Sequence, residues 1–79
     1  RADIYALGVL LYEMLSGHPP FKGSPTQLLF AHIQQPAPDI QDELPSIPYQ
    51  IASAIMRAME KDPNDRQQTA LAFAESLCI

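Results

Sequence analysis

Two serines and two histidines are the residues of this sequence that come nearest to nucleophilic chemistry: Ser16, Ser24, His18 and His32. A serine hydroxyl attacks a substrate only when a base lies within hydrogen-bond reach and a third group orients that base. We expect these four residues on separate elements without such spacing, and His18 in a loop because two prolines follow it. The four residues therefore predict no catalytic centre.

Composition narrows the function classes further. Cys78 is the only cysteine, and no cysteine and histidine set has zinc-site spacing, so we predict no metal site and no internal disulfide, as in a reduced cytoplasmic protein. Nine acidic residues against five basic ones give a net charge of −4, which opposes binding to nucleic acid. The hydrophobic share of 47% is too high for intrinsic disorder.

The elements that carry these residues begin with an apolar helix over residues 2–15, which ends before Gly17 and two prolines. At roughly 21 Å this helix is too short to cross a bilayer. Its apolar side chains lie around nearly the full circumference, so other protein must cover it. Because the chain also starts with Arg1 rather than Met, we expect an incomplete domain. Gly8, in the middle of the helix, predicts close packing against its backbone.

Three further helices are predicted, joined by proline-rich loops. Ser24 begins one that runs to about Gln34, with proline at the first helical position and a capping box completed three residues on. Residues 35–47 hold three prolines and three acids and predict an extended connection. From residue 48 apolar residues recur every four positions and predict a helix that ends at Asp62 and the following proline, and Thr69 is the predicted N-cap of the last helix. The predicted fold class is all-α, with about four short helices.

Two motifs carry a resemblance to a known family. The first is Asp-Ile-Tyr-Ala-Leu-Gly-Val-Leu-Leu-Tyr-Glu-Met at residues 3–14, followed by Gly-His-Pro-Pro-Phe at residues 17–21, and the second is Asp-Pro-Asn-Asp-Arg at residues 62–66. They resemble the central large-lobe helix with its loop, and the Asp-Pro-x-x-Arg segment, of protein kinases. The sequences of these motifs are most similar to those of bacterial serine/threonine kinases. The resemblance implies that residues 1–79 are a partial kinase domain, from the helical large lobe of an α+β fold.

The resemblance also implies structural roles within the first helix. Asp3 matches the helix-start aspartate that accepts hydrogen bonds from the backbone of the catalytic loop; otherwise it is an N-terminal acid favoured by the helix dipole. Leu10 and Met14 match positions that support the stacked apolar spine beneath the adenine pocket, and otherwise they are ordinary core residues. Gly8 belongs to the same matched run.

Two charged residues receive roles from the resemblance with an alternative beside each. Arg66 matches the arginine that pairs with the glutamate closing the activation segment. For the isolated chain we favour a solvated arginine after a helix, because that glutamate would lie upstream of residue 1. Glu13 matches a site that in some kinases touches basic residues of the peptide substrate, but exposed helical glutamates are common.

The residues of phosphoryl transfer are missing from this sequence. It has no Gly-x-Gly-x-x-Gly loop, no strand lysine paired with a helix glutamate, no His-Arg-Asp loop and no Asp-Phe-Gly metal site. ATP and Mg²⁺ would bind elsewhere in a parent kinase that phosphorylates serine or threonine in proteins, and this chain alone is predicted to be inactive. Its partners would be the upstream remainder of the domain and, for the parent, a protein substrate.

Two alternatives remain from the sequence. The chain could be a free-standing helical interaction module or a degenerate kinase remnant, with the exposed faces of its first two helices binding a partner. A small helix-turn-helix DNA-binding protein is opposed by the acidic charge balance.

Overall fold

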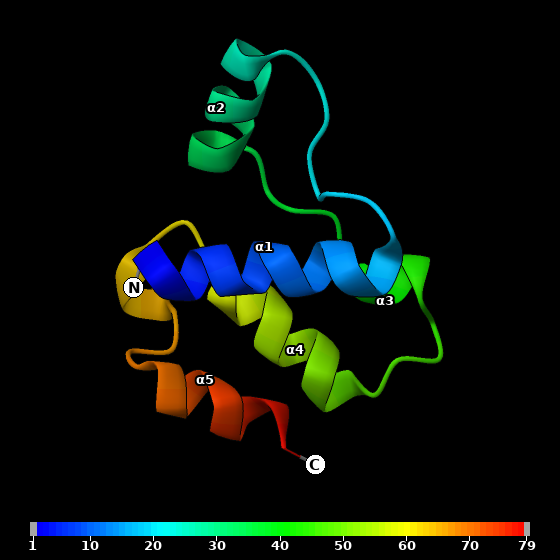
Figure 1. The fold of residues 1–79 in the computed structure, drawn as a ribbon, viewed down its shortest axis with the longest axis vertical. Helices are drawn as coiled ribbons and strands as arrows, with labels where there is room; N and C mark the ends of the chain where they lie inside the picture. Colours follow the sequence, from blue (N-terminus) through cyan, green and yellow to red (C-terminus); the bar gives the residue numbers. More distant parts are fainter. Residues whose placement is uncertain (1, 79) are drawn as a thin grey trace.

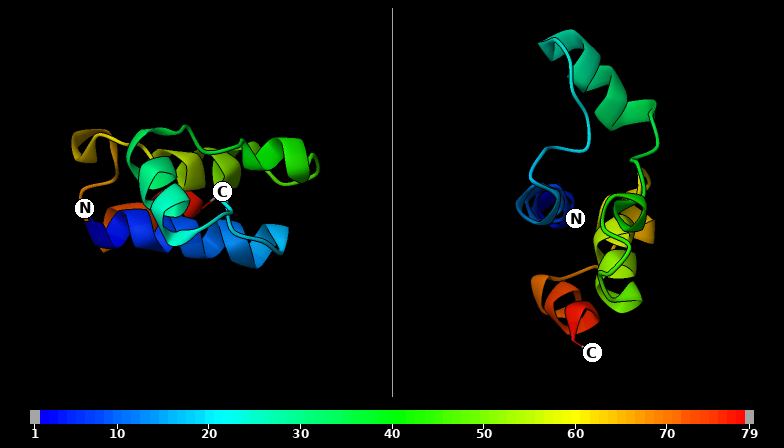
Figure 2. Two further views of the ribbon diagram at one scale, coloured as in Figure 1. Left: turned by 90° about the horizontal axis from the view of Figure 1, so that it is seen from above. Right: turned by 90° about the vertical axis from the view of Figure 1, so that its right-hand side faces the viewer.

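A computed structural model describes residues 2–78, and every regular element among them is helical. The elements in chain order are α1 (Ala2–Ser16), α2 (Pro25–Gln34), α3 (Ile40–Glu43), α4 (Tyr49–Ala58), the 3₁₀ turn η1 (Pro63–Asp65) and α5 (Ala70–Leu77). Helices α1, α4 and α5 pack side by side and, together with α3, form what we call the helical body (Figure 1). Helix α2 lies at the opposite end of the long axis from α5 (Figures 1 and 2). The all-α prediction is confirmed.

Helix α1 packs against α4 with their backbones close together at Gly8. A Cβ atom built on Gly8 would lie 2.8 Å from Cβ of Ala58 and 3.1 Å from Cγ of Met59, closer than two carbon atoms can comfortably approach. The close packing expected at this glycine is therefore present. It places the α1 backbone directly against the C-terminal end of α4.

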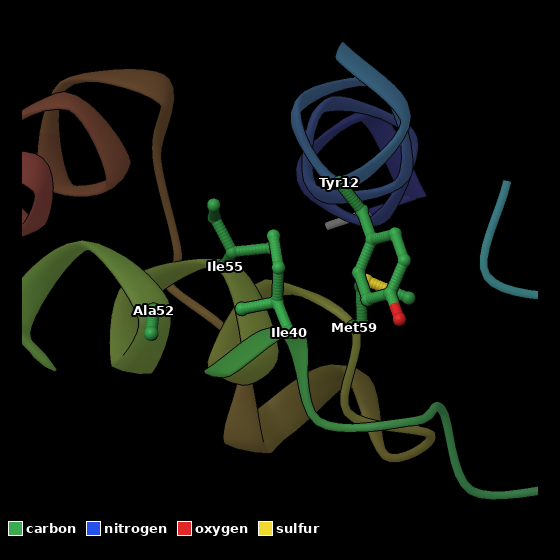
Figure 3. Close-up of a cluster of buried hydrophobic side chains, with 5 residues drawn as sticks. All are labelled: Tyr12, Ile40, Ala52, Ile55 and Met59. Atoms are coloured by element: carbon green, nitrogen blue, oxygen red, sulfur yellow. The ribbon is translucent and has the colours of Figure 1, made fainter. Parts of the chain in front are cut away.

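The centre of the helical body is a cluster of fully buried side chains. Tyr12 points from α1 toward Ile40 of α3 and Ile55 of α4, with Ala52 and Met59 around them (Figure 3). A second, smaller cluster of Ile4, Ala58 and Phe73 joins α1 and α4 to α5. Three of these core positions on α1, residues 4, 8 and 12, recur every four residues and so lie on one helix face.

Helix α2 begins where its capping signals predict. The Ser24 hydroxyl accepts a hydrogen bond from the Gln27 amide at 3.2 Å, and the Ser24 amide donates to Oε1 of Gln27 at 2.7 Å. This is the predicted capping box, with Pro25 at the first helical position. The helix ends at Gln34, before two closely spaced prolines.

The connection after α2 is less extended than predicted. Residues 35–47 contain the one-turn helix α3, whose first residue, Ile40, is fully buried in the core. The Asp39 carboxylate caps this turn by accepting from the Gln41 amide at 3.0 Å. A turn this short has too few residues for a periodic apolar pattern, so only burial of Ile40 and the cap distinguish it from a loop.

The end of the third predicted helix also needs correction. Helix α4 ends at Ala58 rather than at Asp62, and the Met59 amide closes its last turn onto Ile55 and Met56. Asp62 instead caps η1 by accepting from the Asn64 amide at 2.9 Å. Thr69 caps α5 as predicted, accepting from the Ala72 amide at 3.0 Å.

One buried polar residue connects α4 to α5. The Gln67 side chain is almost fully buried, and its amide donates to the Ala54 carbonyl at 3.0 Å and to the Ser76 hydroxyl at 3.1 Å. Ser76 in turn donates to the Phe73 carbonyl. A polar chain of this kind fixes the register of the two helices, because any slip would leave buried groups without partners.

Candidate functional site

The exposed apolar face of α1 is the first candidate surface. Leu7, Leu10 and Met14 are 36%, 51% and 68% exposed, and their spacing of three and four residues places them along one side of the helix. We call these three residues the α1 stripe. Asp3 lies one turn before Leu7 and is also exposed.

Leu10 and Met14 are therefore not core residues of this chain, which corrects one of the two interpretations that the sequence allowed. Helices α4 and α5 pack on the face of α1 that carries Ile4, Gly8 and Tyr12, and the stripe lies away from them. The expectation that α1 has more apolar surface than its short neighbours can cover is met at the stripe. Glu13 is exposed beside it, and its proposed contact with a peptide remains a prediction.

Arg66 closes the turn that follows α4. Its side chain is only 9% exposed, and it donates from Nε to the Glu60 carbonyl at 2.7 Å and from an outer nitrogen to the Lys61 carbonyl at 3.2 Å. The guanidinium carbon lies 4.8 Å from the centre of the Tyr5 ring, at cation–π distance.

The expectation of a solvated Arg66 is therefore wrong. The 3₁₀ turn brings residue 66 back beneath the carbonyls that follow α4, and a planar guanidinium can donate to several of them at once. Within this chain the Asp-Pro-x-x-Arg motif is a folded unit: Asp62 caps the turn, and Arg66 donates to the Glu60 and Lys61 carbonyls that precede it. Its pairing with a glutamate outside the chain remains a prediction.

A cluster around His32 joins α2 to the helical body, and no pattern in the sequence announces it. The Tyr5 hydroxyl lies 2.7 Å from Nδ1 of His32, and the Phe21 ring meets His32 edge to face at 5.0 Å. Lys61 donates from Nζ to the carbonyls of Ala31 at 3.0 Å and His32 at 3.2 Å, and so caps the C-terminal end of α2. Tyr5 and Lys61 are 27 to 30 residues away in sequence from the residues of α2 that they contact, beyond the reach of any local signal.

The charges of the His32 cluster influence one another. Burial, and then the nearby Arg66 cation, lower the pKa of the Lys61 ammonium, while burial raises the pKa of the Tyr5 phenol. Burial also lowers the pKa of His32, with Lys61 as the second cause. His32 is therefore favoured in its neutral form.

His18 makes a second link, which joins the loop that follows α1 to helix α3. Its Nε2 lies 2.6 Å from a carboxylate oxygen of Glu43, and its Nδ1 lies 2.9 Å from the carbonyl oxygen of Pro19. The Pro19 carbonyl and then the Glu43 carboxylate raise the pKa of this imidazole. His18 is a loop residue as predicted, and its pairing with Glu43 was not foreseen.

A groove of about 650 Å³ separates this loop from α2. Its walls are residues 18–22 on one side and, on the other, residues that α2 and its flanking turn supply: Thr26, Gln27, Phe30, Ala31 and Gln35. Two further apolar side chains of α2, Leu29 and Ile33, are 63% and 59% exposed. The walls are mostly apolar or uncharged, with Lys22 at one edge.

The geometry supplies no catalytic arrangement among residues 2–78. The Ser16 hydroxyl donates to the carbonyls of Tyr12 and His18, and the Ser24 hydroxyl caps α2. Both hydroxyls are therefore engaged in hydrogen bonds with the backbone. Within this part of the chain no group of three or more metal-ligating side chains comes together. No described helix is both long enough and apolar enough to span a membrane.

Comparisons with known proteins agree with this picture of a helical kinase segment. A probable serine/threonine-protein kinase of Clostridium perfringens is 46% identical over 71 residues, which cover 89% of this chain and 10% of that protein. The serine/threonine-protein kinase PknE of Mycobacterium tuberculosis is 45% identical over 69 residues, covering 87% of this chain and 12% of its own length. PrkC of Bacillus subtilis, also a serine/threonine-protein kinase, is 39% identical over 71 residues, covering 89% and 11%.

The extent of these matches defines what the chain is. It spans about a tenth of the length of these curated relatives. Residues 1–74 match the sequence model of the family described as protein tyrosine and serine/threonine kinase. With its all-helical structure, the chain is a segment of a kinase large lobe, and it belongs to the protein tyrosine and serine/threonine kinase family.

Proposed function

We propose that the protein containing this segment transfers the γ-phosphate of ATP to serine or threonine hydroxyls of protein substrates in the cytoplasm. The observation that carries the proposal is the similarity to bacterial serine/threonine-protein kinases over nearly nine-tenths of the chain. Phosphoryl transfer depends on positioning and charge neutralisation around Mg²⁺, and the kinase motifs for both are missing from these 79 residues. ATP and Mg²⁺ would therefore be held by the upstream remainder of the domain.

Within such a domain this chain would be a structural support. The α1 stripe is an apolar surface of the kind that another part of a protein covers, and burying each of its side chains would contribute up to about 1.5–3 kcal/mol. Asp3 would accept hydrogen bonds from the backbone of the catalytic loop, and Leu10 and Met14 would support the apolar spine. Arg66 would keep its carbonyl contacts while reaching the glutamate of the activation segment.

The catalytic half of this proposal is tested with the isolated chain. The 79-residue chain should neither bind Mg·ATP in calorimetry nor phosphorylate protein, because it has no phosphate-binding loop, lysine or metal carboxylate of the kinase type. The complete domain, measured in parallel, should do both. Saturable ATP binding by the chain alone would contradict the assignment of nucleotide binding to the upstream part.

The structural half is tested by association with that upstream part. Alone and at high concentration, the chain should self-associate in sedimentation and bind an apolar dye, and adding the upstream remainder as a separate chain should give a complex that unfolds cooperatively at a higher temperature than the chain alone. Replacing Leu10 and Met14 together by Ser should weaken the association, whereas Leu71→Ser, at an exposed leucine on α5, should not.

A second candidate is the free-standing interaction module, and the exposed face of α2 is the observation in its favour. The same experiment separates the two. A compact monomer that binds no apolar dye and ignores the upstream piece would show that the chain is a complete module and not a kinase segment in function.

A further inference from the structure

Residues 18–34 leave the end of α1, form α2 and approach the helical body again at the His32 cluster. We call this stretch the α2 segment. Figure 1 shows α2 standing apart from α1, α4 and α5, and the right-hand view of Figure 2 agrees. A histidine lies at or near each end of the segment. Each histidine makes a side-chain contact with a different part of the protein: His18 with Glu43 and His32 with Tyr5.

The surroundings of His18 suit the doubly protonated ring. Nδ1 faces the Pro19 carbonyl oxygen at 2.9 Å and Nε2 faces a Glu43 carboxylate oxygen at 2.6 Å. Both oxygens only accept hydrogen bonds when Glu43 is ionised, and a neutral imidazole has a single N–H to donate. Only the imidazolium satisfies both contacts. The other groups facing it are the edge of the Tyr12 ring, from α1, and the opposing cation of Lys22, from the same loop.

The surroundings of His32 suit the neutral ring. Nδ1 lies 2.7 Å from the Tyr5 hydroxyl, which can donate to it, and Phe21 covers the ring edge to face at 5.0 Å. The charged groups nearby are both cations: Lys61 donates to the His32 carbonyl at 3.2 Å, and the Arg66 guanidinium lies over the Tyr5 ring at 4.8 Å. A proton on His32 would be repelled by these cations and would remove the acceptor that Tyr5 uses.

We propose that His18 and His32 form a pH-dependent clamp on the α2 segment, in which one end holds only when its histidine is charged and the other only when its histidine is neutral. The segment is then held best in a pH window in which both conditions are met. It loosens at His18 when the pH rises and at His32 when the pH falls. The groove between residues 18–22 and α2 would change shape with it, because His18 lines one wall and Ala31, next to His32, lines the other.

Each limit of the pH window follows from the direction in which the pKa of one histidine is shifted. The pKa of His18 is raised from 6.5, so its contribution is complete at low pH and is lost as the pH rises through the folded-state value. The pKa of His32 is lowered from 6.5, so its contribution is complete at higher pH and is lost as the pH falls through the folded-state value. The window therefore lies on both sides of 6.5, bounded above by His18 and below by His32.

Hydrogen exchange followed by mass spectrometry tests the clamp at protein concentrations low enough to avoid association. Exchange at the C2 position of each imidazole gives both titrations, and peptides covering residues 25–34 and 49–58 give the protection of α2 and α4. Between about pH 5 and about pH 9, protection of α2, corrected for intrinsic exchange, should peak between the two titrations and fall roughly threefold or more on each side. Protection of α4 should stay constant over the central part of this range.

Matched variants assign each side of the window. Glu43→Gln should move the His18 titration down toward the ordinary value and bring the high-pH fall of α2 protection to lower pH. Asp42→Asn removes a neighbouring carboxylate of α3 that is not bonded to His18 and should shift it much less. Tyr5→Phe should move the His32 titration and the low-pH fall alone. Constant α2 protection across the range, or a His18 titration at or below that of His32, would overturn the clamp.

Discussion

The helical body and the α2 segment differ in what holds them. Tyr12, Ile40 and Ile55 are completely buried at the centre of the body, where α1 and α4 meet with almost no space at Gly8. The α2 segment instead exposes Leu29, Phe30 and Ile33, buries Phe21, and contacts the body at a few positions: His18 with Glu43, His32 with Tyr5, and Lys61 with the Phe21 ring and the end of α2. Apolar burial is proportional to area and tolerates changes of pH, whereas polar contacts depend on the charge and position of a few atoms. The two regions should therefore respond differently to the same kind of substitution.

The largest contrast should come from the same substitution, isoleucine to alanine, made once in each region. Ile55→Ala removes a completely buried side chain from the centre of the body and should lower the free energy of unfolding by about 2–5 kcal/mol. Ile33→Ala removes a side chain of α2 that is 59% exposed and should change it by no more than about 0.5 kcal/mol. Urea denaturation, at a concentration where sedimentation shows a monomer, measures both.

If Ile55→Ala leaves no folded protein to measure, Ile55→Val serves in its place, with an expected loss of about 0.5–1.5 kcal/mol. Equal losses at positions 33 and 55 would mean that α2 belongs to the core. The division into two regions would then be wrong.

The second contrast concerns backbone spacing. Alanine is about 1 kcal/mol better than glycine inside a helix, so Gly8→Ala would stabilise α1 if only helix propensity mattered. The added Cβ would meet Ala58 at 2.8 Å, and neither backbone can yield without moving a helix. We expect a net loss of about 1–3 kcal/mol, as in other overpacked cores. As a control, Ala6→Gly on the exposed side of α1 should cost about 1 kcal/mol by helix propensity alone. A gain of stability from Gly8→Ala would show that α1 and α4 can separate freely.

The features predictable from the sequence are those with a local cause. The end of α1 and the starts of α2 and α5 follow from caps and prolines within a few residues, and the structure places them as expected. The 3₁₀ turn η1 was missed because three residues are too few for a periodic apolar pattern. The single-turn α3 was missed because the burial of Ile40 depends on segments that arrive from elsewhere in the chain. The same reason hides the link between Tyr5 and His32.

The resemblance to kinases added what periodicity could not, namely which face of α1 to examine. An apolar helix indicates that something must cover it, but it does not distinguish residues turned toward α4 from those of the α1 stripe. The packed structure then shows the difference directly: Tyr12 is fully buried, and Met14, two residues later, is 68% exposed.

A third contrast removes the cation that caps the end of α2. Lys61→Met keeps the length of the side chain but loses the hydrogen bonds to the Ala31 and His32 carbonyls. We expect hydrogen exchange in α2 to accelerate, because the free energy of opening α2 should fall by about 1.5 kcal/mol. This value is at the low end for hydrogen bonds from a charged donor, because Lys61 is only partly buried. Exchange in α4 should not change. Lys22→Met, at an exposed lysine of the α2 segment, is the matched control, and an equal effect there would mean that overall charge and not the cap is responsible.

The smallest expected effect tests whether α2 folds as a unit of its own. Ser24→Ala removes the hydroxyl that accepts from the Gln27 amide and should cost about 1 kcal/mol, within the range of 0.5–2 kcal/mol for such caps. Because α2 contacts the body through few groups, the loss should appear as fraying and lower helicity of residues 25–34, with little change in the unfolding of α4. Thr69→Ala removes the matching cap of α5, which packs on α1 and α4 through Phe73, so loss of this cap should lower the stability of the whole core. Circular dichroism gives the helicity, and peptide-resolved exchange locates the change. If Ser24→Ala destabilises α4 as much as Thr69→Ala does, α2 is coupled to the core and the two regions unfold as one.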